Sequence, residues 1–305
     1  MAAYRLTGAL RGCESGDVWI ADGVITRTRP PGPVEDVPGV AYPGLVDAHA
    51  HPGLSHTAAP AGDAEVLRRL ETARAAGVTA IREMGAQRDV AGLAAPGRPK
   101  VLRAGRHIAR YKRYIRHLAV DVEPADLAGE ALRQAARGDG WVKVVGDWID
   151  RSEGADSDLR PLWPREALAE AVETDDDALE AGVDCIEHGS GMTRDQMVEA
   201  AARGVLVDPT VCQVATFADI ASRAGRYPVY RRRMLDMHAR RVERLALMVE
   251  TGTLFLMGTD TDGGDPTRIL PVEISAAVAA GMPAGVAMAA ASYAGRRRLG
   301  LPAWQ

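Results

Sequence analysis

Residues 43–52 read PGLVDAHAHP, an apolar run behind a Pro-Gly pair that ends in two histidines. The run predicts a buried strand. Side chains of a strand alternate between its faces, so His49 and His51 would share one face, about 6 to 7 Å apart. Two imidazoles at that spacing can chelate a divalent ion. Two surface histidines at a turn are the alternative interpretation.

From about residue 42 onward, apolar runs alternate with helical runs rich in Ala, Arg and Leu. Further strands are expected in GVTAIREMG, KVLRAG, WVKVVGD, VDCIEHG, VLVDPT and TLFLMGTD, and one long helix over about 227–250. Repeated βα units indicate a parallel sheet. Seven strand candidates in one run favour an α/β fold of the (β/α)₈ TIM-like barrel type over an open sheet.

Residues 1–41 precede this pattern and read as short strands and turns. VWIADGVITRTRP places Asp-Gly between two β-rich runs, which is typical of a hairpin. Because the segment is too short to fold alone, we expect a small β appendage, with residues 42–305 forming the barrel.

Composition excludes several classes of protein. The chain has 305 residues and a formal net charge of −4, so nothing points to a nucleic-acid or membrane partner. Three scattered cysteines give no disulfide framework, and the N-terminus lacks the apolar core of a signal peptide. We expect a cytoplasmic protein acting on a small molecule, and the sequence leaves a homo-oligomer open.

Lys143 is unusual in this chain. Only three of its 37 basic residues are lysines, and Lys143 stands alone in the apolar run WVKVVG. Desolvation depresses the pKa of a buried lysine, and a neutral amine can react with CO₂ to form a carbamate, an anion able to bridge two metals. A lysine that reaches out to solvent is the alternative, although this composition would more naturally use arginine there.

Two more strands end on residues able to bind a metal. His188 closes VDCIEHG, and Asp260 follows the apolar run LFLM. The carboxyl ends of barrel strands meet at one rim, so both residues are expected beside His49 and His51. Asp260 could ligate the ion and act as general base on a bound water. A structural histidine and a capping aspartate are the alternatives.

A basic loop, GRHIARYKRYIRH, follows the third strand. Loops at a barrel mouth hold substrate groups, and Tyr or Arg there could grip a carboxylate or polarise a carbonyl. A solvated loop is the alternative. Gln213, after the seventh strand, could also face the substrate. The substrate-binding candidates are His107, Tyr111, Tyr114, Arg116, His117 and Gln213.

PGLVDAHAHP, WVKVVGDW, AGVDCIEHGSG and MGTDTDGG, in this order, closely resemble motifs of the amidohydrolase superfamily, above all its imidazolonepropionase-like and Xaa-Pro dipeptidase-like hydrolases. The resemblance runs from about residue 15 to the end. It implies a deformed barrel with a small β-sandwich built from both chain ends. It implies that His49, His51 and Asp260 hold one ion, that carbamylated Lys143 bridges, and that His188 helps hold a second.

This resemblance implies a reaction as well. A metal-bound hydroxide would cleave an amide, lactam or ester bond of a small molecule or dipeptide. Asp260 would take the proton and pass it to the leaving group, with Lys143 as the bridging ligand. Zinc is the first choice for the one or two ions, although imidazole and carboxylate ligands also suit other divalent metals.

The chain departs from the family pattern between Lys143 and His188. The pattern expects a fifth-strand histidine there, but no histidine lies between these residues, which are only 45 positions apart. Two barrel units need roughly 60 residues at about 250 per eight units. About one βα unit therefore looks absent near 172–176, as do returning strands at the C-terminus. Either the sequence omits segments of a longer natural chain, which we favour, or the protein has lost them.

Three functional hypotheses follow. The first is a metal-dependent amidohydrolase acting on C–N bonds, as a dipeptidase or cyclic amidase, with esterase activity in addition. The second is a non-catalytic or single-metal relative that acts as a binding protein. The third is a deaminase of the superfamily, which Lys143 disfavours because such enzymes usually use one metal and lack the bridging lysine.

Overall fold

The structure, a computed structural model, describes residues 3–12, 16–55, 57–172, 183–302 and 304. Its centre consists of two three-stranded parallel sheets, ordered β5-β6-β7 and β12-β13-β14. Their strands are β5 (Leu45–Ala50), β6 (Val78–Glu83), β7 (Lys100–Arg103), β12 (Cys185–Glu187), β13 (Leu206–Asp208) and β14 (Leu254–Phe255). The parallel arrangement that the βα pattern predicts is therefore present.

Backbone hydrogen bonds join the two sheets into one arc. The Ala48 amide donates to the Met257 carbonyl at 2.9 Å, and the Asp260 amide to the His49 carbonyl at 2.7 Å. At the other end, the Ile108 amide of β8 (Ile108–Arg110) donates to the Lys143 carbonyl at 2.8 Å. No strand pairing among the described residues closes this arc, so the α/β class is shown and a closed barrel stays a prediction.

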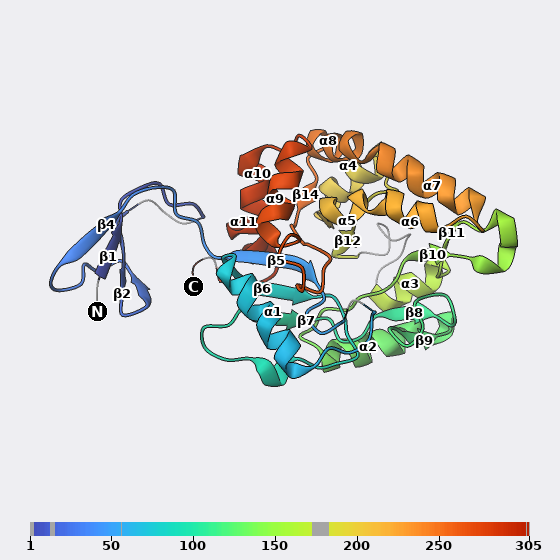
Figure 1. The fold of residues 1–305 in the computed structure, drawn as a ribbon, viewed down its shortest axis with the longest axis horizontal. Coiled ribbons are helices and arrows are strands. Elements are labelled where there is room, and N and C mark those ends of the chain that lie inside the picture. Colours follow the sequence, from blue (N-terminus) through green and yellow to red (C-terminus); the bar gives the residue numbers. More distant parts are fainter. Residues whose placement is uncertain (1–2, 13–15, 56, 173–182, 303, 305) are drawn as a thin grey trace.

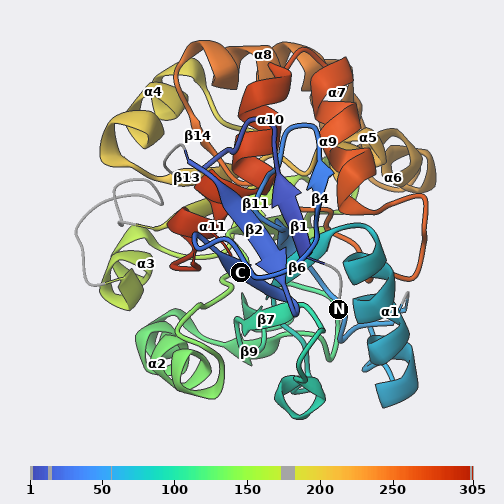
Figure 2. The same cartoon turned by 90° about the vertical axis from the view of Figure 1, so that its left-hand side faces the viewer.

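Helices surround the strands, as Figure 2 shows from one end. They are α1 (Asp63–Ala75), α2 (Leu127–Arg137), α3 (Arg165–Val172), α4 (Arg194–Arg203), α5 (Val211–Ala215), α6 (Phe217–Arg223), α7 (Pro228–Ala239), α8 (Arg241–Glu250), α9 (Leu270–Ala279), α10 (Ala284–Ala291) and α11 (Tyr293–Arg298). The long helix expected over 227–250 is wrong in one respect, because Arg240 separates α7 from α8.

The strand expected in WVKVVGD also differs from the structure. Within it Val144 makes an isolated β-bridge to Ile108, and regular pairing begins only at its last residue, Asp147, which starts β10 (Asp147–Ile149). β10 pairs with β11 (Leu159–Pro161) in an antiparallel hairpin, and β8 pairs with the short β9 (Val120–Val122). Of the region near 172–176, Val172 ends α3 and the remaining positions lie outside the described residues.

A separate four-stranded sheet, ordered β3-β2-β1-β4, lies to one side of the arc (Figure 1). Its strands are β1 (Ala3–Leu6), β2 (Val18–Ala21), β3 (Val24–Thr26) and β4 (Val34–Val37). The predicted hairpin is confirmed, since β2 and β3 pair antiparallel across Asp22 and Gly23, which have φ values of 51° and 77°. All strands of this sheet come from the first 37 residues, so the expectation of a β-sandwich built from both chain ends is wrong for the described residues, which form one N-terminal sheet. The boundary at residue 41 stays a prediction.

The inside of the arc is packed with small and branched side chains. Val46 and Ala48 of β5, Ala80 of β6 and Leu206 of β13 belong to one buried cluster. Alternation along β6 points Arg82 to the same side as Ala80, and this arginine is 1% exposed. Among the described residues, no helix has the length and apolar character that a membrane crossing requires.

Candidate metal centre

Three side chains from the predicted set meet at the carboxyl ends of the strands. Both His49 Nε2 and His51 Nε2 approach Asp260 Oδ1, at 3.3 and 3.2 Å. His49 and His51 come from the end of β5, whereas Asp260 lies in the segment after β14, and this segment is hydrogen-bonded to the end of β5. Two imidazoles and a carboxylate converging in this way form a group that could hold a metal ion.

His188 and Lys143 lie beside this group. The His188 ring is 5.4 Å from the His49 ring, and His188 Nε2 is 3.9 Å from Asp260 Oδ2. Lys143 is close enough that its positive charge acts to lower the pKa of His49 and of His188. The structure thus brings together the five residues predicted around the ions, although it does not test their roles as ligands.

The backbone at two of these residues is strained. His188 and Asp260 both adopt left-handed conformations, with φ values of 67° and 48°. Such conformations cost of order 1 kcal/mol or more for non-glycine residues, and they persist where the surroundings fix them. Here the His188 amide donates to the Asp208 carbonyl and the Asp260 amide to the His49 carbonyl, both at 2.7 Å. The turn at each strand end therefore directs a polar side chain toward the group.

The second nitrogen of His49 has a partner that the sequence analysis missed. His49 Nδ1 lies 2.7 Å from Glu187 Oε2, and Glu187 Oε1 accepts from Arg82 Nη2 at 2.8 Å. Arg82 also donates from Nε to the Ala48 carbonyl at 2.6 Å and lies over the Trp141 ring. The chain of contacts fixes the ring of His49 so that Nε2 faces Asp260.

Asp208 and Gly258 pack against His49. Asp208 Oδ1 accepts from the Gly258 amide at 2.9 Å. A Cβ added at Gly258 would lie 2.4 Å from Asp208 Oδ2 and 2.4 Å from both the Cβ and the amide nitrogen of His49. Only glycine fits there without displacing His49.

The electrostatics prepare the group for a cation. Burial disfavours the charged form of Asp260, yet His49, His51 and His188 around it hold its pKa well below its usual value. Burial lowers the pKa of His188 to about 4 and lowers that of His51. At neutral pH the centre therefore offers a carboxylate and two neutral imidazoles, the protonation states that bind metals.

His49 is the exception. Burial acts against its charge, but Asp260 and Glu187 outweigh this effect and raise its pKa to about 9. Binding of an ion at Nε2 would displace that proton and supply its own positive charge between the same carboxylates.

His49 also belongs to a second group of potential ligands, with Glu187 and Asp208. That group would use Nδ1. Arg82 already places a buried positive charge 2.8 Å from Glu187, and a cation beside it would be repelled. The donor set of His49, His51 and Asp260 has no such neighbour at hydrogen-bonding distance among the described residues, so it fits a divalent ion better.

The substrate-binding candidates divide into two sets. His107 is 2% exposed and stacks on His51 with a ring distance of 5.4 Å, and Tyr114 stacks on His107 at 5.8 Å. The other set is not brought to the group by any described contact. Tyr111, Arg116 and His117 are exposed, and Gln213, in α5, accepts from Arg268 through Oε1 at 2.8 Å.

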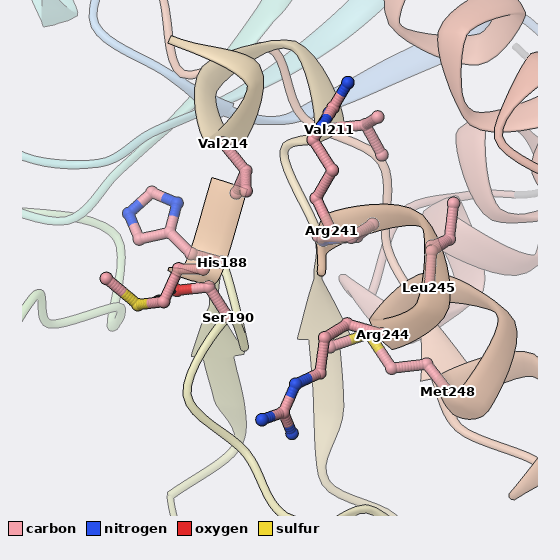
Figure 3. A pocket seen from close by; sticks show the side chains of 10 residues that line it. His188, Ser190, Val211, Val214, Arg241, Arg244, Leu245 and Met248 are labelled. Carbon is pink, nitrogen blue, oxygen red and sulfur yellow. Dashed lines mark hydrogen bonds between the residues drawn. The ribbon is translucent and has the colours of Figure 1, made fainter. Parts of the chain in front are cut away.

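A small hollow opens beside His188 (Figure 3). Val211 and Val214 of α5 and Leu245 and Met248 of α8 give it an apolar lining. Figure 3 also shows Arg241 and Arg244 of α8 on its walls. Their guanidinium groups donate to the backbone carbonyls of His238 and Met192.

No family model matches the chain. Its sequence is 40% identical over 306 residues to the uncharacterized protein Rv2915c of Mycobacterium tuberculosis strain H37Rv and to a protein of Mycobacterium bovis, covering 93% of this chain and 81% of each relative. Among solved structures it is similar to an Xaa-Pro dipeptidase with bound methionine in the active site, with a TM-score of 0.72, 19% identity and coverage of 98% and 89%. A structure described as an amidohydrolase has a TM-score of 0.74 and 18% identity, and the match covers 98% of this chain and 87% of that one. For Aspergillus niger ochratoxinase the TM-score is 0.73 and the identity 17%, with 97% of this chain and 84% of that one covered.

These likenesses define the class of protein by fold alone: the chain has the fold of solved structures described as an Xaa-Pro dipeptidase, an amidohydrolase and an ochratoxinase, which is the fold that the resemblance of its four motifs implies. At the level of sequence, it belongs to one family with the mycobacterial proteins.

Proposed function

We propose that the protein is a metal-dependent hydrolase that cleaves an amide, lactam or ester bond of a small molecule or dipeptide. The observation that carries the proposal is the convergence of His49 Nε2 and His51 Nε2 on one oxygen of Asp260. Two imidazole nitrogens directed at one carboxylate oxygen, with Glu187 bound to Nδ1 of His49, are the arrangement of a metal site rather than of a purely structural cluster.

His49, His51 and Asp260 would hold one ion, with zinc as the first choice. His188 would contribute to a second, and Lys143, as a carbamate, would bridge the two. A bound divalent ion lowers the pKa of a coordinated water toward neutrality and polarises a carbonyl oxygen. The chain's own part is to position these ligands and to hold a proton acceptor beside the reacting atoms.

Asp260 is that acceptor. Its Oδ1 faces His49 and His51, and its Oδ2 lies 3.9 Å from His188 Nε2, so the carboxylate spans both halves of the centre. It would take a proton from the attacking water and return it to the leaving nitrogen or oxygen. His107 and Tyr114, stacked beside His51, would wall the substrate on one side.

The proposed chemistry agrees with the proteins that share the fold. Structures described as an Xaa-Pro dipeptidase, an amidohydrolase and a prolidase are among them. We therefore propose that this chain cleaves amide C–N bonds in preference to ester bonds. We also propose that the arc of strands closes into a (β/α)₈ barrel over residues 42–305, with residues 1–41 as the appendage.

The test is to purify the protein from medium with added zinc and bicarbonate. Metal content and hydrolysis of a panel of dipeptides, N-acyl amino acids, lactams and aryl esters are then measured before and after treatment with a chelator. We expect at least one equivalent of metal and an activity that the chelator removes and zinc restores. Less than a tenth of an equivalent, with no turnover of any substrate, would favour a binding protein instead.

A further inference from the structure

An arginine lies on the buried face of α1. Val66, Arg69 and Leu70 share that face, and Arg69 is only 3% exposed although its side chain is charged. A charged side chain is rarely buried unless it has partners that compensate for the lost water. The partners of Arg69 therefore show what this buried charge does.

The first partners of Arg69 lie in the His51 loop, residues 51–55. Nη1 of Arg69 donates to the Pro52 carbonyl at 3.0 Å and also to the Leu54 carbonyl. Pro52 and Leu54 are buried, and the Leu54 amide donates back to the His51 carbonyl at 2.9 Å. Since a buried carbonyl needs a donor, Arg69 fixes the path of the chain directly after His51.

The next partner lies in the Asp260 loop, residues 259–264. Nη2 of Arg69 donates to Asp262 Oδ2 at 3.0 Å, and to Glu65 Oε1 of its own helix at 2.6 Å. Asp262 Oδ1 accepts from the Gly264 amide at 2.8 Å, so both oxygens of this carboxylate are held. Because Asp262 follows Asp260 by two residues, this contact fixes the chain directly after the second ligand.

One guanidinium thus joins the two loops that carry His51 and Asp260. The loops also meet directly, where the His51 amide donates to the Thr261 carbonyl at 2.7 Å. A guanidinium holds its N–H groups in one rigid plane, and here Nη1 serves one loop and Nη2 the other. The link therefore resists any change in the 3.2 Å separation between His51 Nε2 and Asp260 Oδ1.

We infer that Arg69 is a positioning residue for the metal centre, which holds the His51 loop and the Asp260 loop at the spacing that a shared ion requires. Among the described residues, its hydrogen bonds reach neither His51 nor Asp260 themselves, so it acts through the loops and not as a ligand. The inference rests on the proposed function and deepens it by naming the residue that keeps two of the ligands in place.

The experiment uses variants that break each half of this link. Arg69→Gln removes the charge, and Arg69→Lys keeps the charge without the planar set of donors. Asp262→Asn keeps the acceptor for the Gly264 amide and removes the charge that faces Arg69. Because the Asp262 side chain is 23% exposed, this variant should fold even if Arg69→Gln does not.

Arg296→Gln is the matched control. Arg296 is another buried arginine, 1% exposed, and its Nη1 donates to the Gly44 carbonyl at 3.3 Å and to Thr79 Oγ1 at 2.8 Å. Gly44 directly precedes β5, so these contacts lie at the amino end of the strand, opposite to the end that carries His49 and His51. The control thus removes a buried charge of the same kind without changing either loop.

Two properties are measured for each protein. Hydrogen exchange followed by mass spectrometry reports how firmly the two loops are held, and it needs no metal. Competition with a chromophoric chelator gives the affinity for zinc. Circular dichroism and the thermal midpoint show whether each variant is folded.

We expect faster exchange of both loops in Arg69→Gln and a fall in zinc affinity of about tenfold or more, as for other outer partners of metal ligands. Arg69→Lys should lie between Arg69→Gln and the wild type. Asp262→Asn should lose less affinity, and combining it with Arg69→Gln should cost less than the sum of the two changes because they remove one shared contact. Arg296→Gln should lower the thermal midpoint and leave the exchange of both loops and the zinc affinity unchanged.

Unchanged zinc affinity in folded Arg69→Gln would overturn the inference, and so would an equal loss in Arg296→Gln, because Arg69 would then serve stability alone. If Arg69→Gln does not fold, unchanged zinc affinity in Asp262→Asn overturns it. Zinc binding that depends on Arg69, in a protein that hydrolyses none of the substrates, would instead refute the proposed function alone.

Discussion

His49 Nδ1 lies 2.7 Å from Glu187 Oε2, and both side chains are almost completely buried. The contact keeps the Nδ1 proton of His49 on the side of Glu187 and leaves Nε2 to face Asp260. Carboxylates that hold a ligating histidine in this way fix its ring and tautomer. Arg82, 2.8 Å from the other oxygen of Glu187, holds the carboxylate in place.

Replacement of Glu187 by glutamine should therefore weaken metal binding. Because the amide side chain would keep one acceptor but lose the negative charge, we expect the affinity for zinc to fall about 10- to 100-fold, as it does when other outer partners of metal ligands are changed. Competition with a chromophoric chelator measures it. Glu71→Gln, on the exposed face of α1, is the matched control and should bind zinc like the wild type. Unchanged affinity in Glu187→Gln would show that the contact does not prepare His49.

Lys143 gives a prediction about the carbamate. Lys143→Ala should lower the turnover number by several orders of magnitude, since it removes the proposed bridging anion. Acetate or propionate added to this variant should restore part of the activity by supplying a carboxylate at the same place. Initial rates at increasing acid concentration measure the rescue. Wild-type turnover in Lys143→Ala would rule out the assignment.

Gly258 allows Asp208 and His49 to pack closely beside the metal centre. In Gly258→Ala the new methyl group would stand 2.4 Å from His49 and Asp208, so the backbone must shift. We expect a loss of about 1–3 kcal/mol in the free energy of unfolding, together with weaker zinc binding. Gly285→Ala on α10, where nothing lies within 4 Å of the added Cβ, should show no such loss. Urea unfolding of the three proteins measures the difference, and equal stability would contradict the close packing seen here.

Glu83 makes stability depend on pH. Burial raises its pKa from 4.5 to about 8, although the hydrogen bond from the Gly85 amide acts in the opposite direction. The folded state therefore holds a proton that the unfolded state releases, so this contribution is complete below pH 4.5 and is lost as the pH rises to about 8.

Glu83→Gln cannot lose that proton, so its stability should depend less on pH across this window. The difference between the two proteins should reach about 4 kcal/mol near pH 8, with the variant the more stable. Thermal unfolding at pH 5, 6.5 and 8 measures it, and parallel curves for both proteins would show that Glu83 is ionised when folded.

Much of the candidate centre could be predicted because strand-end positions are readable from the sequence. His49 and His51 follow an apolar run, Asp260 follows another, and parallel strands bring such ends to one edge. The roles of these residues stay predictions.

The residues that hold the centre were harder to see. Arg82 lies in the run AIREM, where a charged side chain would ordinarily be placed on the solvent face of a strand. The signal that it points inward is its position two residues after the buried Ala80, on the same face of the strand. Glu187 directly precedes His188, and its contact with His49 links positions 138 residues apart. Propensity also predicted a strand around Lys143, where tertiary packing leaves a single bridge at Val144.

A crystal grown with zinc and measured at the zinc absorption edge tests the proposed metal centre most directly. We expect an anomalous peak about 2.0–2.2 Å from His49 Nε2, His51 Nε2 and a carboxylate oxygen of Asp260. No peak there, or a peak on the Nδ1 side of His49 between Glu187 and Asp208, would contradict it.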